Sequence, residues 1–437
     1  MLNTILCILI SIAFVYILAN PKVPNSLLFL LLAPILILTH VLDAATVWGF
    51  FANNSLHLVM IISVYASLMA VSGFDEQIGE TFERMTRNIH GKNRERGLFG
   101  IIFVLAALCS TIMANSSVTM AMVPALYGIS RRMKISRSKL VLFVIYASTL
   151  GGACTLIGTD TNIFANAALE EAGITPFAMF DFAWVGIPIA ILGGIYMVMF
   201  HHLNKSYDDL EDADSSMPAP KERTDDMARV MKRQQTGIFL GFFSFILILL
   251  LNSFDFFKAL DINAYAYGYL TIGLLYGFKC FSWKEVLHGF NFERMFMIVG
   301  LLAVIKMITN SSLGNWIGAL LEQSIGGSTS MYFIFTVLFI VTVIITQFMN
   351  NMAACGVISP IAITIAGTLG ADPRAFIMAI AIAAGCGYMT PFASGTNQRM
   401  SVFAKSTIVD YMRYGWPLII ITYLCALLIL PHVFPFF

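Results

Sequence analysis

The sequence predicts an all-α polytopic membrane protein built from two inverted repeats, and three observations lead to this prediction. The 437 residues are 58% hydrophobic and only 12% charged, whereas a soluble domain carries roughly 25% charged residues. Apolar runs of about 18 or more residues, the length that a membrane-spanning helix needs, recur along the chain. The two halves of the chain also carry the same polar motifs at nearly the same spacing.

The apolar segments predict ten membrane-spanning helices and two re-entrant hairpins. The longest polar stretch, 202–235, is expected to be a solvated cytoplasmic linker, so that 1–201 forms the first repeat and 236–437 the second. The first segment has no basic residues before it, and we expect it to remain as a helix rather than to be cleaved as a signal. The predicted segments are 2–19, 26–42, 55–73, 97–129, 139–170, 181–201, 236–251, 262–278, 295–309, 331–368, 375–400 and 413–433.

Matching motifs indicate an internal duplication. Asn115 stands 47 residues before Asn162, and Asn351 stands 46 residues before Asn397. In each half the first of these asparagines is followed nine residues later by a proline. Further along, "DFAWVGIP" and "DYMRYGWP" place a glycine five residues and a proline seven residues after an aspartate. Several motifs in the same order at the same spacing are typical of a repeated unit.

The basic residues predict that the two repeats have opposite orientations in the membrane. Segments 97–129 and 331–368 are too long for one crossing and are interrupted by polar residues, so each is expected to enter and leave on one side. Lys and Arg in 83–96 and 131–139 place both flanks of the first hairpin in the cytoplasm. The stretch 310–330, before the second hairpin, has no Lys or Arg and is expected outside. Inverted repeats with broken helices are typical of secondary transporters.

The polar interruptions predict one cation cage in each half. A hairpin tip and a broken helix ("IGTDTN" in one half, "FASGTN" in the other) bring free carbonyl and side-chain oxygens together inside the membrane. Irregular backbone at this depth is tolerated only where protein or a water-filled cavity satisfies its polar groups. The alternative interpretation is that these small polar residues only hold the helices together.

These residues resemble the divalent-anion/sodium symporters, the dicarboxylate, citrate and sulfate carriers of the ion transporter superfamily. That family has a Ser-Asn-Thr tip in each of two opposed hairpins, and a Thr-Pro-Pro-like turn followed by Asn in each of two broken helices. Here residues 114–116 read Ala-Asn-Ser and residues 350–352 read Asn-Asn-Met. The turns 159–161 and 394–396 are each followed by Asn. The resemblance implies an elevator-type transporter whose scaffold domain dimerises.

The resemblance also implies two sodium sites and a substrate site between the two tips. The implied sodium ligands are Ser110, Asn115 and the Gly158 carbonyl in the first half, and Thr346, Asn351 and the Ala393 carbonyl in the second. The implied substrate-binding residues are Asn115, Ser116, Thr161, Asn162, Asn351, Thr396 and Asn397. At the second tip Met352 stands where the family has a threonine, and Met cannot donate a hydrogen bond.

Two charged residues beside the broken turns are further candidates, because an ionisable residue at membrane depth predicts a functional site. Asp160 could bind a cation or a proton, or could cap its helix. Arg399 could hold an anion, pair with Asp160, or reach the cytoplasmic surface.

The predicted function is sodium-coupled symport of a small anion (a dicarboxylate, sulfate or similar) by an elevator mechanism. The alternative is a cation/proton antiporter of the same superfamily that uses Asp160. A channel, an arsenite-type efflux permease and a signalling or structural membrane protein fit the two polar cages less well. No nucleophile–base set and no GxxxxGK[ST] loop occur in the sequence, so we expect neither an enzyme with catalytic residues nor ATP-driven transport.

The expected partners follow from the predicted function. They are the substrate anion, sodium as the coupling ion, membrane lipid and a second copy of the chain in a homodimer, without a further cofactor. The net charge of +1 gives no reason to invoke nucleic acid. The expected location is the bacterial inner membrane.

Overall fold

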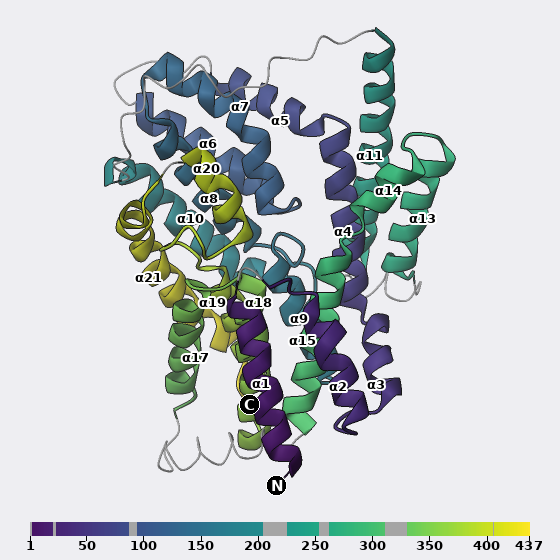
Figure 1. The fold of residues 1–437 in the computed structure, drawn as a ribbon. Helices are drawn as coiled ribbons and strands as arrows, with labels where there is room; N and C mark the ends of the chain where they lie inside the picture. Colours follow the sequence, from purple (N-terminus) through teal and green to yellow (C-terminus); the bar gives the residue numbers. More distant parts are fainter. Residues whose placement is uncertain are drawn as a thin grey trace.

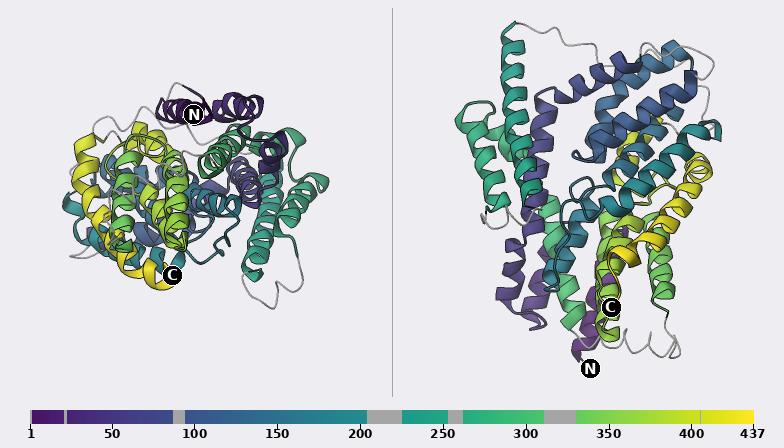
Figure 2. Two further views of the ribbon diagram at one scale, coloured as in Figure 1. Left: turned by 90° about the horizontal axis from the view of Figure 1, so that it is seen from below. Right: turned by 180° about the vertical axis from the view of Figure 1, so that it is seen from behind.

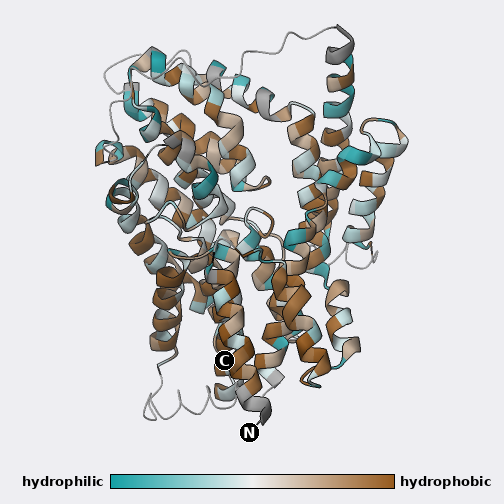
Figure 3. Cartoon of the chain, in the orientation of Figure 1, coloured by the Kyte–Doolittle hydropathy of each residue, from teal (hydrophilic) through white to brown (hydrophobic). Residues whose placement is uncertain are grey.

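The computed structural model describes residues 2–20, 23–86, 94–203, 225–252, 262–310, 330–404 and 406–437. Every regular element within these residues is a helix (Figure 1), so the predicted all-α class is confirmed. Hydrophobic residues cover most of the helical surface (Figure 3).

The first half of the chain begins with α1 and ends with the short turn η3. Its elements are α1 (Leu2–Ala19), η1 (Leu28–Leu32), α2 (Ala33–Leu38), α3 (Ala44–Gly49), η2 (Phe50–Ala52), α4 (Asn54–Val71), α5 (Phe74–Thr86), α6 (Arg94–Ser110), α7 (Asn115–Met133), α8 (Arg137–Gly152), α9 (Asp160–Glu171), α10 (Ala183–Met199) and η3 (His201–Leu203).

The second half of the chain begins with α11 and ends with α21. Its elements are α11 (Asp225–Leu251), α13 (Ala264–Gly277), α14 (Trp283–Gly289), α15 (Phe292–Asn310), α17 (Met331–Thr346), α18 (Asn351–Leu369), α19 (Arg374–Gly385), α20 (Gly395–Ala404) and α21 (Ile408–Val433).

Both predicted hairpins and both predicted helix breaks are present. The chain leaves the helix at 111–114 and at 347–350, between α6 and α7 and between α17 and α18. It leaves the helix again at 153–159 and at 386–394, which separate α8 from α9 and α19 from α20. A break needs residues that gain little from being helical, and the glycines and threonines of "IGTDTN" and "FASGTN" meet that need.

The helices form two groups that can be followed in Figures 1 and 2. The outer group consists of α1–α4, α11 and α13–α15, in which α4 packs against α13 and α14, and α11 packs against α13. The hairpin group consists of α6–α10 and α17–α21. In this group each half contacts the other, because α18 packs against α9 and α20 packs against α8. The two groups meet where α15 and α4 contact α9 and where α15 contacts α18.

Four described helices are long and apolar enough to cross a membrane by length and composition. They are Asn54–Val71, Arg229–Leu251, Asn351–Leu369 and Ile408–Val433. Several predicted spans are made of shorter pieces, because the hairpins and breaks divide them. The chain is therefore an integral membrane protein.

Part of the predicted linker is helical. Residues 225–235 of the predicted linker are helical, because α11 begins at Asp225. The sequence "ARVMKRQQ" within them consists almost entirely of strong helix formers. Residues 204–224, 87–93 and 311–329, on which much of the topology prediction depends, lie outside the described residues.

Candidate functional site

The first hairpin tip carries a cluster of oxygen atoms around the amide of Asn115. Asn115 is the first residue of α7, and Ser110 is the last residue of α6. The Ser110 hydroxyl lies against the Asn115 amide. The same end of the amide lies 3.1 Å from the Ser148 carbonyl oxygen and 3.3 Å from the Gly158 carbonyl oxygen. The neighbours of this amide are therefore all hydrogen-bond acceptors or a hydroxyl.

The second tip repeats this arrangement around Asn351, the first residue of α18. The Thr346 hydroxyl lies 3.0 Å from the Asn351 amide and also donates to the Ala384 carbonyl oxygen at 2.7 Å. The amide meets the Ala393 carbonyl oxygen at 2.5 Å and that of Ala384 at 3.2 Å. The structure thus brings the six predicted cation-site residues together in two groups of three.

An asparagine amide can face such a cluster in two orientations that have the same shape, because its oxygen accepts hydrogen bonds and its nitrogen donates them. With the nitrogen turned inward, Asn115 donates to Ser148 and Gly158, and Asn351 donates to Ala384 and Ala393. With the oxygen turned inward, several neutral oxygens face one another. That second arrangement needs a cation between them, because hard cations bind oxygen ligands.

The carbonyls of Ser148 and Ala384 are ligand candidates that sequence reasoning missed. Both belong to the C-terminal parts of helices that end at a break, α8 and α19. A backbone oxygen carries no signal of its own in the sequence. The usable signal is its position: each stands a few residues before a predicted break.

Two glycines allow the first tip and the first break to approach each other closely. A Cβ atom placed on Gly152 would collide with the Asn115 amide and with the Gly158 carbonyl. A Cβ on Gly158 would collide with the backbone of Gly152. A side chain at either position would therefore push the Gly158 carbonyl out of the cluster.

Matching hydrogen bonds hold each tip against its broken helix. Thr155 in the first break donates to the Thr111 carbonyl at 2.5 Å, and Thr390 in the second break donates to the Gln347 carbonyl at 2.7 Å. Thr111 and Gln347 each begin a tip loop. Because each tip is tied to the adjacent break, a tip and its break are expected to move as one unit.

The prediction that Asn162 and Asn397 bind substrate is not supported by their placement. Both are 1% exposed and neither lines the cavity between the tips. The Asn162 amide nitrogen donates to the Thr155 carbonyl at 2.9 Å, and that of Asn397 donates to the Thr390 carbonyl at 3.0 Å. They brace the two breaks instead, because one turn of helix points each side chain back toward its own unwound segment.

A cavity of about 160 Å³ lies between the two tips. Its volume is that of roughly five water molecules, which suits a small ligand. Helix α4 closes one side through Ile62, Ser63 and Ala66. Five of the seven predicted substrate-binding residues line it: Asn115, Ser116, Thr161, Asn351 and Thr396.

The cavity is electropositive. Helices α7, α9, α18 and α20 all begin at its wall, and a helix N-terminus carries a partial positive charge and free N–H groups. Arg294 and Arg399 also line it, against one acidic residue, Asp160. This combination favours an anionic ligand.

The ion-pair partner of Asp160 is Arg294 and not Arg399 as considered from the sequence. The Arg294 Nη1 and Asp160 Oδ1 atoms are 3.2 Å apart. Arg294 comes from α15, in the outer group, and Asp160 from α9, in the hairpin group. Sequence alone does not reveal a contact between residues so far apart in the chain.

Ser63 is a second cavity residue that the sequence did not reveal. Its hydroxyl oxygen is buried and has no hydrogen-bond partner among the described residues, and it lines the cavity from α4. A buried hydroxyl without a partner costs free energy, so it is a natural contact for a bound polar ligand.

A wide groove leads to the second tip. Its volume is about 1440 Å³, and Asn350 lines both this groove and the cavity. Other parts of its wall come from Asn20, Val23–Ser26, Glu293 and Met412. Ligand could therefore reach the cavity along this path.

Comparison with known proteins finds similarity to transporters. A family model described as citrate transporter matches residues 14–375. The sodium-dependent dicarboxylate transporter SdcS of Staphylococcus aureus (strain USA300) is 24% identical over 446 residues, covering 95% of this chain and 83% of that protein. The uncharacterized transporter YfbS of Escherichia coli is 27% identical over 160 residues, but this match spans only 26% of its length and 36% of this chain.

The fold also has a solved counterpart. The crystal structure of the YdaH transporter of Alcanivorax borkumensis superimposes with a TM-score of 0.62 at 14% sequence identity, covering 96% of this chain and 97% of that one. At this identity the likeness concerns the fold alone.

Proposed function

The chain belongs to the citrate transporter family, and from that premise we propose that this transporter carries a small dicarboxylate-type anion together with sodium. The observation that carries the proposal is the electropositive cavity between two oxygen clusters. The cavity offers helix N-termini and two arginines to an anion. The clusters offer neutral oxygens to cations. The sodium dependence of the SdcS relative supports sodium as the cation.

The anion would lie against both tips and both broken helices. Arg294 and Arg399 would neutralise its charge, and Ser63 would donate to it from α4. Met352 cannot donate, which leaves the second tip with fewer contacts than the first. The first tip keeps a hydroxyl, that of Ser116, at the cavity wall.

The two tip asparagines give a physical route for coupling, because each lies in a cluster and also lines the cavity. When sodium binds, the amide oxygen turns toward the ion and the amide nitrogen turns toward the cavity, where it donates to the anion. When sodium leaves, the nitrogen turns back to the carbonyls and presents its oxygen to the cavity, where it repels an anion. Sodium and anion would therefore bind best together.

We also propose that the two halves are inverted repeats and that the hairpin group moves against the outer group as an elevator. The support is that α7 and α18 have 19 residues each, and that both breaks are braced in the same way. The contacts between the groups include the Asp160–Arg294 pair and a Lys306–Glu171 pair at 2.9 Å. Both join α15 to α9, and both would have to open during transport. By resemblance to the family, the outer group would form a homodimer in the bacterial inner membrane.

A second candidate is a cation/proton antiporter, and the presence of Asp160 in the cavity favours it. In that mechanism the carboxylate exchanges a proton for a cation. The contact with Arg294 argues against it, because this arginine already places a positive charge beside the carboxylate.

The experiment that tests the proposal is a thermal-shift panel of small anions on the purified protein, in sodium chloride and in choline chloride. A transported dicarboxylate should raise the unfolding temperature in sodium and much less in choline, because a ligand stabilises the state that binds it. If no anion stabilises the protein in either salt, the anion site is wrong. If sodium makes no difference, the cation clusters are wrong.

A further inference from the structure

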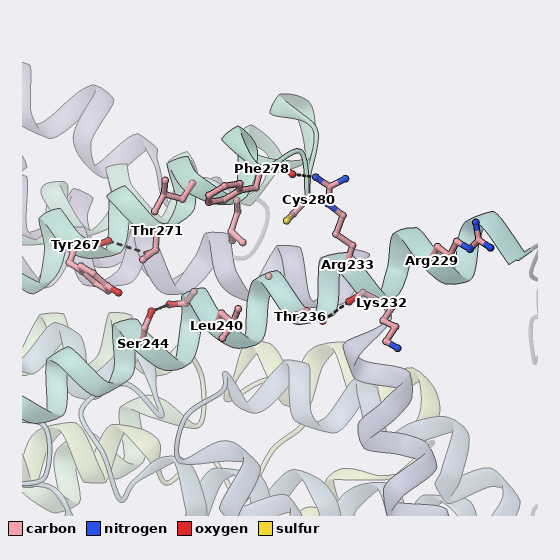
Figure 4. Close-up of a pocket in the computed structure, with 14 residues that line it drawn as sticks. Arg229, Lys232, Arg233, Thr236, Leu240, Ser244, Tyr267, Thr271, Phe278 and Cys280 are labelled. Atoms are coloured by element: carbon pink, nitrogen blue, oxygen red, sulfur yellow. Dashed lines mark hydrogen bonds between the residues drawn. The ribbon is translucent and has the colours of Figure 1, made fainter.

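A second cavity lies away from the candidate transport site, between α11 and α13 at the edge of the outer group (Figure 4). Its volume is about 660 Å³, within the range of about 300–1,000 Å³ that is typical of small-molecule sites. Figure 2 shows α11 and α13 on the outside of the bundle. The cavity therefore opens toward the surroundings of the protein rather than toward its core.

The wall of this cavity presents hydrocarbon to its contents. Leu240 and Leu274 line it, and they are 64% and 45% exposed. The serine and threonine hydroxyls in its wall are bonded to carbonyls of their own helix: Thr236 to Lys232 at 2.9 Å, Ser244 to Gly241 at 2.9 Å and Thr271 to Gly268 at 2.8 Å. Because these hydroxyls already have hydrogen-bond partners, they do not need a polar ligand.

One end of the cavity is basic. Arg229, Lys232 and Arg233 line it at that end (Figure 4), and no described acidic residue lines it. The Arg233 guanidinium donates to the Phe278 carbonyl near the C-terminus of α13, which fixes its position. Arg229 and Lys232 are exposed.

The dimensions match one leaflet of a membrane. From Arg233 to Ser244 the helix rises roughly 17 Å, at about 1.5 Å per residue. Half of a hydrocarbon core of about 30 Å is roughly 15 Å. The basic end lies at the start of α11, which the proposed topology places on the cytoplasmic side.

We propose that this cavity binds an anionic phospholipid of the cytoplasmic leaflet. The acyl chain would lie along the apolar wall, and the phosphate would lie between Arg229 and Lys232. Charge complementarity favours this occupant over a neutral lipid, because basic pockets between helices on the cytoplasmic side suit anionic headgroups. Charge also favours a lipid over a second copy of the chain, because an interface between two copies would bury the three basic side chains at this end.

Native mass spectrometry of the full-length protein in detergent, titrated with dioleoyl phosphatidylglycerol or dioleoyl phosphatidylcholine, tests the proposal. We expect the parent to bind phosphatidylglycerol in preference to phosphatidylcholine. The double variant Arg229→Gln/Lys232→Gln should weaken phosphatidylglycerol binding roughly 25-fold, at about fivefold for each cation removed. Because no anion substrate or sodium is added, the result does not depend on the proposed transport function.

The matched control is Lys134→Gln/Lys284→Gln, which removes two charges from the same proposed membrane face outside this cavity. It should change phosphatidylglycerol binding less than twofold. Equal binding of the two lipids, or an equal effect of the two double variants, would overturn the proposal. Leu240→Trp fills the cavity and should reduce binding. If it instead converts a dimer into monomers with lipid binding unchanged, the cavity is an interface between copies and the proposal is wrong.

Discussion

Replacing Asn115 by aspartate separates a cation ligand from a structural asparagine. In the cation-free protein the Asn115 amide nitrogen can donate to the Ser148 and Gly158 carbonyls at 3.1 and 3.3 Å and to the Ser110 hydroxyl. A carboxylate cannot donate these bonds. The Ser110 hydroxyl can still donate to a carboxylate, so only the two carbonyls lose their donor. At about 1.5 kcal/mol for each unpaired carbonyl, within the usual range of about 1–3 kcal/mol, Asn115→Asp should destabilise the cation-free protein by about 3 kcal/mol.

Sodium should restore this loss. A carboxylate oxygen binds a cation at least as well as an amide oxygen does, so the variant should gain more from sodium than the parent. Saturation to 100 times the dissociation constant stabilises a protein by about 2.7 kcal/mol. For 437 residues the entropy of unfolding is about 0.9 kcal/mol/K. The loss and the recovery should therefore each shift the unfolding temperature by about 3 °C.

The measurement is thermal unfolding in sodium chloride and in choline chloride of equal ionic strength. The control is Asn166→Asp, because the Asn166 side-chain oxygen accepts a bond from the Phe177 N–H and a carboxylate can still accept it. The control should show the same sodium effect as the parent. If Asn115→Asp also shows only the parent's sodium effect, Asn115 is not a cation ligand and the first cluster is structural.

The other predictions concern the second cluster, the cavity charges and the topology. Asn351→Ala should raise the sodium concentration needed for transport roughly 5- to 150-fold, and an unchanged sodium dependence would remove the second cation site. Asp160→Asn should leave transport intact and change the apparent sodium affinity less than about fivefold, because its partly exposed ion pair is weak; loss of transport at every pH would favour the antiporter. Arg294→Gln should raise the dicarboxylate concentration that gives half-maximal transport at least about tenfold, since a hydrogen bond to a charged group is worth about 1.5–3 kcal/mol. An unchanged half-saturating concentration would place the anion elsewhere. The loop 171–180 has no Lys or Arg and is expected outside, so in a cysteine-free background Lys134→Cys and Thr175→Cys should label from opposite membrane faces; labelling from one face would contradict the topology.

The hairpins and breaks could be predicted because polar residues interrupt runs that are otherwise apolar. A polar group inside a membrane needs a partner, so "IMANSS" and "QFMNNM" indicate irregular chain even without a structure. The roles of Ser110, Asn115, Thr346 and Asn351 as cation ligands came from the family resemblance, whereas the interruption signal located only the tips. The interruptions could locate the tips because each tip stands at nearly the same distance before its break in the two halves of the sequence.

The remaining part of the site depends on contacts that the sequence does not record. Ser63 and Arg294 reach the cavity from α4 and α15, helices that are distant from the tips in the chain. Asn162 and Asn397 carry the expected residue type at the expected position, but their side chains point back to the breaks. Their partners are carbonyls of the irregular segments, and the spacing of residue types does not supply the path of irregular chain.

The central claim is that sodium and a small anion cross together, and uptake into proteoliposomes tests it most directly. Purified protein is reconstituted, and uptake of radiolabelled succinate is measured under an inward sodium gradient, under an equal choline gradient, and under a proton gradient without sodium. The account predicts uptake that requires the sodium gradient and is abolished in the double variant Asn115→Ala/Asn351→Ala. Equal uptake under sodium and choline, or sodium–proton exchange without any uptake of succinate, sulfate or citrate, would contradict it.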